Sequence, residues 1–147
     1  MTNVTTFDGD FDFLNMFYNC KVTVGKLTYL NAYSAFVAAK CKNENDKRAF
    51  TRLNAIKAKK RNNTINKRDD WDDIKVDVMK NIQRAKFDQN PELKKKLMSI
   101  DGTIENRVMY TDTFWSKNMI HNKGKNMLGK ILMELRDEYN QQEDEKV

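Results

Sequence analysis

A glycine-containing turn with two lysines stands directly before an amphipathic segment near the end of the chain. The turn reads Lys123-Gly124-Lys125-Asn126, and the apolar stripe of the segment follows at Met127, Leu128, Ile131, Leu132 and Leu135. A helix start offers unpaired N–H groups and the positive end of the helix dipole, both of which attract anions. The turn therefore predicts either a phosphate site to which Lys125 adds charge, or an ordinary helix start capped by Asn126. It is not a Walker A loop, because no serine or threonine follows the lysine.

Two further features near this turn suggest a ligand. Gly129 lies inside the expected helix, where glycine costs about 1 kcal/mol relative to alanine, so it predicts close approach of another backbone or of a ligand. Upstream, Glu105 precedes an aromatic and acidic stretch, YTDTFW (110–115). Trp115 in this loop is either a stacking surface for a planar ring or a plug in the core.

Other kinds of catalytic site are not visible in the sequence. No Ser-His-Asp set, zinc-ligand spacing or dinucleotide-binding fingerprint is present, and His121 is the only histidine. Cys20 and Cys41 are not spaced as a Cys-x-x-Cys pair. We therefore expect no metal and no cofactor, and the residues alone support a small-ligand site without a named reaction.

Length and charge limit the class of protein. The chain has 147 residues, the size of one ordinary domain, and no apolar run approaches the roughly 18 residues of a membrane helix. The N-terminus lacks the features of a signal peptide, so we expect a soluble cytoplasmic protein without a membrane partner. The net charge of +6 attracts polyanions, from a dinucleotide to DNA, although a solvated helix face explains most lysines equally well. A third alternative, a plain nucleic-acid-binding protein driven by its charge, ranks last, because the basic stretch 57–68 contains no aromatic residue of the kind that single-strand binders use.

The elements that would position these residues follow from local patterns. Residues 7–30 read as short strands with a turn at Gly25. Expected helices run over 32–42, from Asn45 or Asp46 to Lys60, over 71–87, from Pro91, and from 127 onward. Asn31 is expected to cap the first of these helices and Asp70 the helix over 71–87. The fold class is thus mainly α, or α+β with a small N-terminal β element. We expect a single domain over 1–139 and a polar, frayed tail over 140–147.

Several segments together resemble the NADAR, or YbiA-like, family. WDDIKVDVMKNIQRAKFDQNPELKKKL (71–97) resembles the family block W-x-x-x-K-x-x-V-M-x-x-x-x-x-A-K-F-x-Q-x-x-x-L. DTFW followed by GKNMLGKILMELR resembles its C-terminal motif, and YLNAYSAFVAAK falls where the family has S-x-E-H-x-x-Q-A-x-K. The resemblance covers roughly residues 7–137.

The resemblance implies a fold and a chemistry. Family members are N-glycosidases with a single-domain, mainly helical fold. Some cleave ribosylamino-pyrimidine phosphates, and others remove ADP-ribose from guanine in DNA. The implied ligand is an ADP-ribose-like or ribosyl-phosphate small molecule, with ADP-ribosylated DNA or a protein as further partners. Such a site needs a carboxylate to stabilise the oxocarbenium ion or activate water, or a lysine that attacks the opened sugar as a Schiff base.

The resemblance also implies individual site residues. Lys40 matches the lysine of the Q-A-x-K helix, and Lys75 belongs to the central block. Implied catalytic residues are Lys40, Glu105 and Asp112, together with Tyr33 as a substitute. Implied ligand-binding residues are Trp71, Trp115, Lys125, Asn126, Gly129 and Arg136.

The chain departs from the family at the first half of this site. Tyr33 replaces the family's glutamate, while Ser34, Val37, Met16 and Ser116 replace its histidine, glutamine, asparagine and glycine. An uncharged phenol can donate a proton at pH 7 but cannot act as a carboxylate. Two alternatives follow: a weakened N-glycosidase, or an inactive member that acts by binding a ligand or a partner protein.

Overall fold

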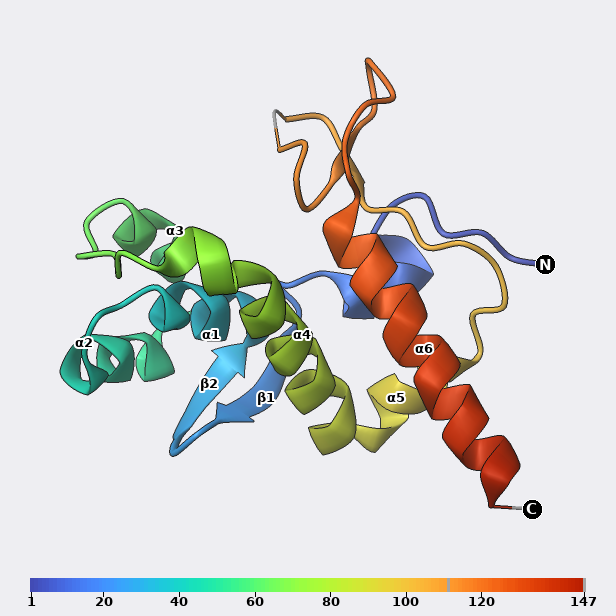
Figure 1. Ribbon diagram of the computed structural model, residues 1–147, viewed down its shortest axis with the longest axis horizontal. Coiled ribbons are helices and arrows are strands. Elements are labelled where there is room, and N and C mark those ends of the chain that lie inside the picture. The colour runs from blue at the N-terminus through green and yellow to red at the C-terminus, as the bar shows by residue number, and fades with distance from the viewer. Residues whose placement is uncertain (111, 147) are drawn as a thin grey trace. The chain divides into compact units, whose positions relative to one another are not determined.

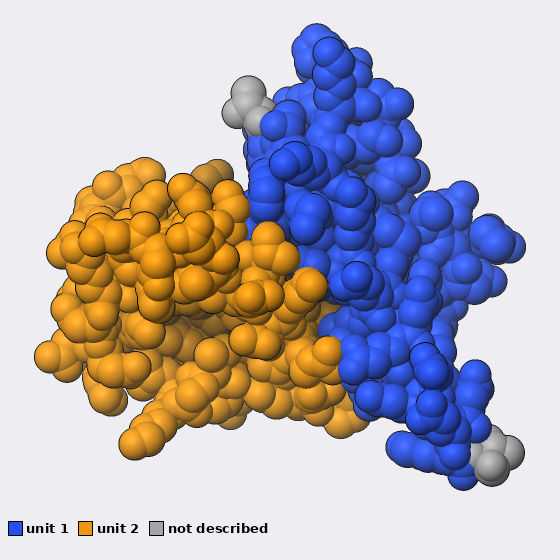
Figure 2. Space-filling view, viewed as in Figure 1, with its two compact units in different colours: residues 1–15, 92–147 blue, residues 16–91 orange. Residues whose placement is uncertain are grey.

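The structure is a computed structural model that describes residues 1–110 and 112–146 (Figure 1). Within these residues the chain is mainly helical with a few short strands, so the predicted fold class is confirmed. The chain divides into two compact units (Figure 2), residues 16–91, here the central unit, and residues 1–15 with 92–147, here the terminal unit. The predicted single domain over 1–139 stays a prediction.

The central unit begins with a β-hairpin. Strands β1 (Asn19–Val24) and β2 (Leu27–Asn31) pair antiparallel, with Val22 opposite Tyr29. Gly25 has a φ of +62°, a left-handed conformation that glycine adopts without a steric penalty. The alternation along β2 buries Leu27 and Tyr29 and exposes Thr28, as expected for a strand with one covered face. The hairpin is the β element that the sequence predicted.

Upstream of the hairpin, the predicted strand is wrong. Residues Gly9–Leu14 form the 3-10 helix η1 in the terminal unit, which buries Phe13 and Leu14. The aromatic residues of this segment favoured a strand. Only Phe13 and Leu14 are buried by η1, however, and a short helical turn can bury two neighbouring side chains as well as a strand can. Gly9 enters the turn with a φ of +55°.

Three short helical elements follow helix α1 (Ala32–Ala39) in the central unit: α2 (Glu44–Arg48), η2 (Ala49–Arg52) and α3 (Ala55–Asn62). The sequence predicted one helix over α2 to α3, and this is wrong. Leu53 is extended, and the Asn54 side chain caps a new helix by accepting a hydrogen bond from Lys57 N at 2.9 Å. Asn31 caps α1 in the same way, through Ser34 N at 2.7 Å, as predicted.

Helix α4 (Trp71–Gln89) is the long helix that the sequence predicted, and it packs on β1 and α1 within the central unit. Its most deeply buried apolar residues are Trp71, Met79, Ile82 and Phe87. Asp70 precedes it but does not cap it, because its carboxylate pairs with Arg68 at 2.6 Å. Helix α5 (Pro91–Met98) begins at the proline, as expected.

The terminal unit is held together by its last helix, α6 (Met127–Glu145), and by short backbone pairings. Val4 bridges Ile104 in parallel, and β3 (Arg107–Val108) pairs with β4 (Lys117–Asn118). The predicted stripe of α6 is confirmed at Leu128, Ile131, Leu132 and Leu135, which are buried, whereas Met127 at its start is only half-buried. The helix runs on to Glu145, beyond the predicted domain end, because the polar residues after Tyr139 include no proline or glycine that would stop it. Val147 of the predicted tail and Thr111 of the 110–115 stretch lie outside the described residues.

Gly129 has a packing role here that leads to a stability prediction. A Cβ added there would collide with the carbonyl oxygen of Ile104 and with the Asn126 side chain, so the close approach is that of the protein's own backbone. Gly129→Ala should lower the free energy of unfolding by about 1–3 kcal/mol through overpacking, despite alanine's better helix propensity. Chemical denaturation measures this, with exposed Lys130→Ala on the same helix as the control. A Gly129→Ala protein as stable as the wild type would contradict the close contact.

Candidate functional site

The lysine that the family resemblance singled out lies over two aromatic rings in the central unit. Lys40 is the C-cap of α1, and its Nζ is 5.3 Å from the centroid of the Phe36 ring and 5.6 Å from that of Trp71. The two rings meet edge to face with their centroids 5.2 Å apart. Lys40 Nζ also donates a hydrogen bond to Asn62 Oδ1 at 3.1 Å. Lys40, Phe36, Trp71 and Asn62, from three helices, are here called the lysine cluster.

Main-chain contacts fix the loop that surrounds the lysine cluster. Arg68 N donates to the carbonyl of Lys40 at 2.8 Å, and Cys41 forms an antiparallel bridge with Lys67. The chain after α3 is therefore fastened to the end of α1 directly before Trp71 begins α4. This pairing brings Asn62, Lys67 and Trp71 to Lys40, although all three are distant from it in the sequence.

The environment of Lys40 makes its amine easier to deprotonate. Burial lowers the pKa of Lys40, because the charged form loses solvation, and the nearby charge of Lys67 lowers this pKa further. Among the described residues no carboxylate pairs with Lys40. A half-buried amine with a lowered pKa is the form of lysine that acts as a nucleophile toward carbonyl carbons.

Tyr33, which occupies the family's glutamate position, lies on the same helix as Lys40. The two are seven residues apart, about 10 Å along a helix axis, and the helical period places them on the same side. The Tyr33 ring is half-buried and packs on Phe17, with ring centroids 4.8 Å apart. Its backbone N donates to Met16 O at 3.0 Å.

The other departures from the family pattern have become part of the core. Ser34 is fully buried and its hydroxyl donates to Leu53 O at 3.0 Å. Val37 is fully buried, and the Met16 sulfur accepts a hydrogen bond from Gln83 Nε2 at 3.0 Å. These side chains therefore stabilise the fold, and none of them restores a carboxylate.

In the terminal unit, Asp112 organises a tight turn. Its Oδ1 accepts hydrogen bonds from Phe114 N and Trp115 N, both at 3.0 Å, and its Oδ2 accepts one from the Ser116 hydroxyl at 3.2 Å. Trp115 packs edge to face on Phe114, with centroids 4.7 Å apart. The geometry gives Asp112 a structural function, and its predicted catalytic function stays a prediction.

Glu105 is surrounded by cations. Its Oε2 accepts a hydrogen bond from Arg107 Nε at 2.7 Å and lies 3.9 Å from Lys117 Nζ. Both cations compete with a developing oxocarbenium ion for this carboxylate, so the geometry favours a structural ion pair. The catalytic function of Glu105 also stays a prediction.

The start of α6 is not the open anion site that the glycine-lysine turn suggested. Met127 N donates to Phe114 O at 3.0 Å and Leu128 N donates to Trp115 O at 3.1 Å, so these amides are already paired. Asn126 has a left-handed backbone with a φ of +50°, and its side chain does not cap the helix. The amide instead accepts from Asn106 N at 2.9 Å and donates to Ile104 O at 3.0 Å. The premise of unpaired N–H groups at Met127 and Leu128 is wrong, because the 113–116 segment lies across this helix start.

Two other predicted ligand-binding residues also serve the fold. Arg136 is almost buried, and its Nη1 donates to Ile100 O at 2.7 Å and Gly102 O at 2.8 Å. Lys125 is exposed and its Nζ lies 5.4 Å from the centroid of the Phe114 ring. A ligand-binding function for Arg136, Lys125, Asn126 or Gly129 stays a prediction.

The predicted site residues thus fall into two groups. Tyr33, Lys40 and Trp71 belong to the central unit, while the group from Glu105 to Arg136 belongs to the terminal unit. That both groups form one site stays a prediction. Sequence reasoning missed Phe36, whose position one helical turn before Lys40 was a usable signal, and Asn62 and Lys67, for which the loop carries no local signal.

Within 1–110 and 112–146, no three histidine, cysteine, aspartate or glutamate side chains gather as metal ligands. No helix in that part of the chain is long and apolar enough to cross a membrane.

Comparison with known proteins gives consistent matches. The NADAR domain family model matches residues 6–140. A riboflavin biosynthesis protein of Vibrio vulnificus is 32% identical over 135 residues, which are 89% of this chain and 36% of that protein. The N-glycosidase YbiA of Escherichia coli is 38% identical over 71 residues, 48% of this chain and 44% of YbiA.

The solved NMR structure of E. coli YbiA is similar to this chain with a TM-score of 0.83 and 26% identity, covering 97% of this chain and 86% of that one. The curated relatives are matched over less than half of their own length. Because the family model spans nearly the whole sequence, this chain belongs to the NADAR domain family and has the YbiA-like fold.

Proposed function

We propose that this chain is a slow N-glycosidase that cleaves the bond between ribose C1 and nitrogen in a phosphorylated ribosyl compound, with Lys40 as the nucleophile. The observation that carries the proposal is the lysine cluster. Lys40 is half-buried, its pKa is lowered, no described carboxylate pairs with it, and Asn62 orients its amine at 3.1 Å. Relatives that bear the name N-glycosidase support the reaction class.

The proposed reaction is balanced as a hydrolysis. The ribose ring first opens to a protonated imine between C1 and the base nitrogen. The lone pair of Lys40 Nζ attacks C1 to form an aminal, and a proton passes from Nζ to the base nitrogen. The C1–N bond then breaks, which leaves a protonated imine on Lys40 and the free base. Water then adds to the resulting imine carbon and releases the sugar aldehyde, which returns the free amine. The net change is one water consumed per N-glycosidic bond.

The aromatic rings of the lysine cluster support this function by excluding water. Phe36 and Trp71 are almost completely buried, and their ring centroids lie 5.3 Å and 5.6 Å from Lys40 Nζ, so apolar surface lies beside the amine. Removal of water raises the proportion of neutral amine. Trp71 thus acts on the lysine, and a stacking contact with the ligand is not required of it.

The substrate candidates are a ribosylamino-pyrimidine phosphate and ADP-ribosyl-guanine. The test incubates the protein with each compound and follows base release by chromatography, against a reaction without enzyme. Release of the base from either compound above the uncatalysed rate supports an N-glycosidase. Rates equal to the uncatalysed reaction for both would contradict it.

A second function, ligand binding without turnover, rests on a different observation. Tyr33 stands where the family has glutamate, and Ser34 and Val37 are built into the core. If these replacements have removed catalysis, ADP-ribose or ribose 5-phosphate should bind stoichiometrically in calorimetry while no base is released. Turnover of either substrate excludes this alternative.

A further inference from the structure

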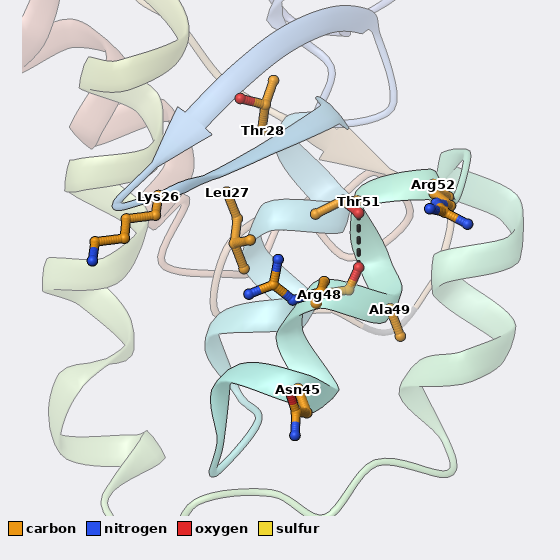
Figure 3. Close-up of a pocket in the computed structure, with 8 residues that line it drawn as sticks. All are labelled: Lys26, Leu27, Thr28, Asn45, Arg48, Ala49, Thr51 and Arg52. Carbon is orange, nitrogen blue, oxygen red and sulfur yellow. Dashed lines mark hydrogen bonds between the residues drawn. The ribbon is translucent and has the colours of Figure 1, made fainter.

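A pocket in the central unit, which shares no lining residue with the lysine cluster, contains several cations. It has a volume of about 590 Å³ and lies between the β1–β2 hairpin and the α2–η2 segment (Figure 3). It is here called the hairpin pocket, and its lining residues are Lys26, Leu27, Thr28, Asn45, Arg48, Ala49, Thr51 and Arg52. Three of the eight are basic and none is acidic.

The cations of this pocket form no salt bridge among the described residues. No carboxylate of the described residues pairs with Lys26, Arg48 or Arg52, and all three residues are exposed. The acidic residues of α2, Glu44 and Asp46, do not line the pocket. Neighbouring cations without acidic partners create a positive electrostatic potential, which a bound anion would neutralise.

Other basic residues of the central unit add to the positive potential at the hairpin pocket. The central unit holds 17 lysines and arginines against eight aspartates and glutamates, a net +9, whereas the whole chain has +6. The excess of positive charge therefore lies entirely in the central unit. The last turn of α3 adds Lys59, Lys60 and Arg61, and Arg61 lies 5.9 Å from the centroid of the Phe50 ring of η2.

The arrangement of the cations fits a row of phosphates more closely than one compact anion. In Figure 3, Arg48 points from α2 toward Leu27 of the hairpin, while Lys26 and Arg52 lie on either side of it. The three side chains do not converge on a single point. The pocket contains no aromatic ring, which removes the base stacking that single-strand binders use.

We propose that the hairpin pocket binds the phosphate backbone of duplex DNA. Lys26, Arg48 and Arg52 contact successive phosphates, and the Thr28 hydroxyl and the Asn45 amide add polar contacts at the walls of the pocket. The Thr51 hydroxyl donates to Arg48 O at 2.7 Å and so holds the η2 wall of the pocket (Figure 3). Binding is independent of base sequence, because contacts with the backbone carry no sequence information. It is also independent of the chemistry at Lys40.

The test measures binding of a fluorescein-labelled, unmodified DNA duplex to the full chain over a series of salt concentrations. The triple variant Lys26→Gln, Arg48→Gln, Arg52→Gln should lose at least about tenfold in affinity at low salt, and the slope of log K against log salt should shrink by about 2 to 3. The control is Lys80→Gln, Lys95→Gln, Lys130→Gln, which removes the same charge from exposed positions outside the pocket. This control should keep most of the affinity and the slope.

Other results would overturn the proposal. Equal losses in both triple variants would show a general effect of net charge, and tighter binding of a single strand or of an RNA duplex would point to a different partner. ADP-ribose or pyrophosphate that binds in calorimetry with the same dependence on the three residues, while duplex DNA does not bind, would identify a small-anion site. Thermal denaturation of each variant confirms that it is folded. Because the DNA is unmodified, the outcome does not depend on whether the protein cleaves N-glycosides.

Discussion

Replacing Lys40 by methionine should reduce N-glycoside turnover by at least about 10²-fold, the lower range for a positioned catalytic group. Methionine has a similar length and keeps the packing on Phe36 and Trp71, but it has no amine to attack C1. Lys40→Arg should be equally inactive, because its guanidinium keeps the charge and remains protonated. Base release under saturating substrate measures both variants.

Chemical trapping of the imine distinguishes a nucleophilic Lys40 from one that only supports the fold, because only a nucleophile forms an imine with the sugar. Sodium borohydride reduces an imine to a stable amine, so incubation with ribose 5-phosphate and borohydride should add one sugar to Lys40, detected by peptide mass spectrometry. Since burial lowers the pKa of Lys40, its free amine persists at lower pH than that of an ordinary lysine. As the pH is lowered, labelling of Lys40 should therefore persist to a lower pH than is usual for a lysine amine.

The matched control for activity is Lys57→Met, on the exposed side of α3. It should keep full turnover. Normal turnover by a folded Lys40→Met protein would show that Lys40 only holds Asn62 and Trp71 in place, and the nucleophile would then have to be sought elsewhere. Absence of a sugar adduct on Lys40, with turnover present, would favour activation of water by a carboxylate.

Tyr33→Glu should raise turnover by about 10²- to 10⁴-fold, the contribution of a positioned acid–base group. Tyr33 is only half-buried, so a carboxylate can be solvated there without the penalty of full burial. It shares its face of α1 with Lys40, where a negative charge can stabilise the oxocarbenium ion and the protonated imine. Comparison of kcat with that of Tyr33→Gln, which has the same size and no charge, isolates the effect of the carboxylate.

Adding Val37→Gln and Met16→Asn to Tyr33→Glu would restore the family's glutamine and asparagine as well, but this triple variant is a less informative experiment. Val37 is fully buried, and Met16 is nearly so. Val37→Gln would place an amide in the core at a cost of about 1–3 kcal/mol unless it finds partners. A folded but inactive Tyr33→Glu protein would therefore favour the binding-only alternative more clearly than an inactive triple variant, whose inactivity could come from misfolding.

The local sequence was enough to predict those helices that have a regular apolar repeat or a clear N-cap residue. In α6, the apolar stripe at every third or fourth position is buried as predicted, since one face of a helix is enough to form its share of the core. Asn31 signalled the start of α1 because its side chain replaces a missing backbone partner, which needs no distant residue. The family motifs also point to Lys40, since its place in the Q-A-x-K helix is a matter of order and spacing along the chain.

Tertiary structure alone decided how the functional residues are used. The sequence before α6 offered a lysine-rich helix start, but the 113–116 segment covers its amides. Asn62 and Lys67 reach Lys40 only because the loop after α3 is hydrogen-bonded to the end of α1, a contact between residues more than 20 positions apart. The cations of the hairpin pocket come from a turn and from α2–η2, which no local pattern relates. Such contacts depend on which chain segments pack together, and this is decided by the core as a whole. Helix caps and apolar repeats, by contrast, depend only on a few residues that are neighbours in the sequence.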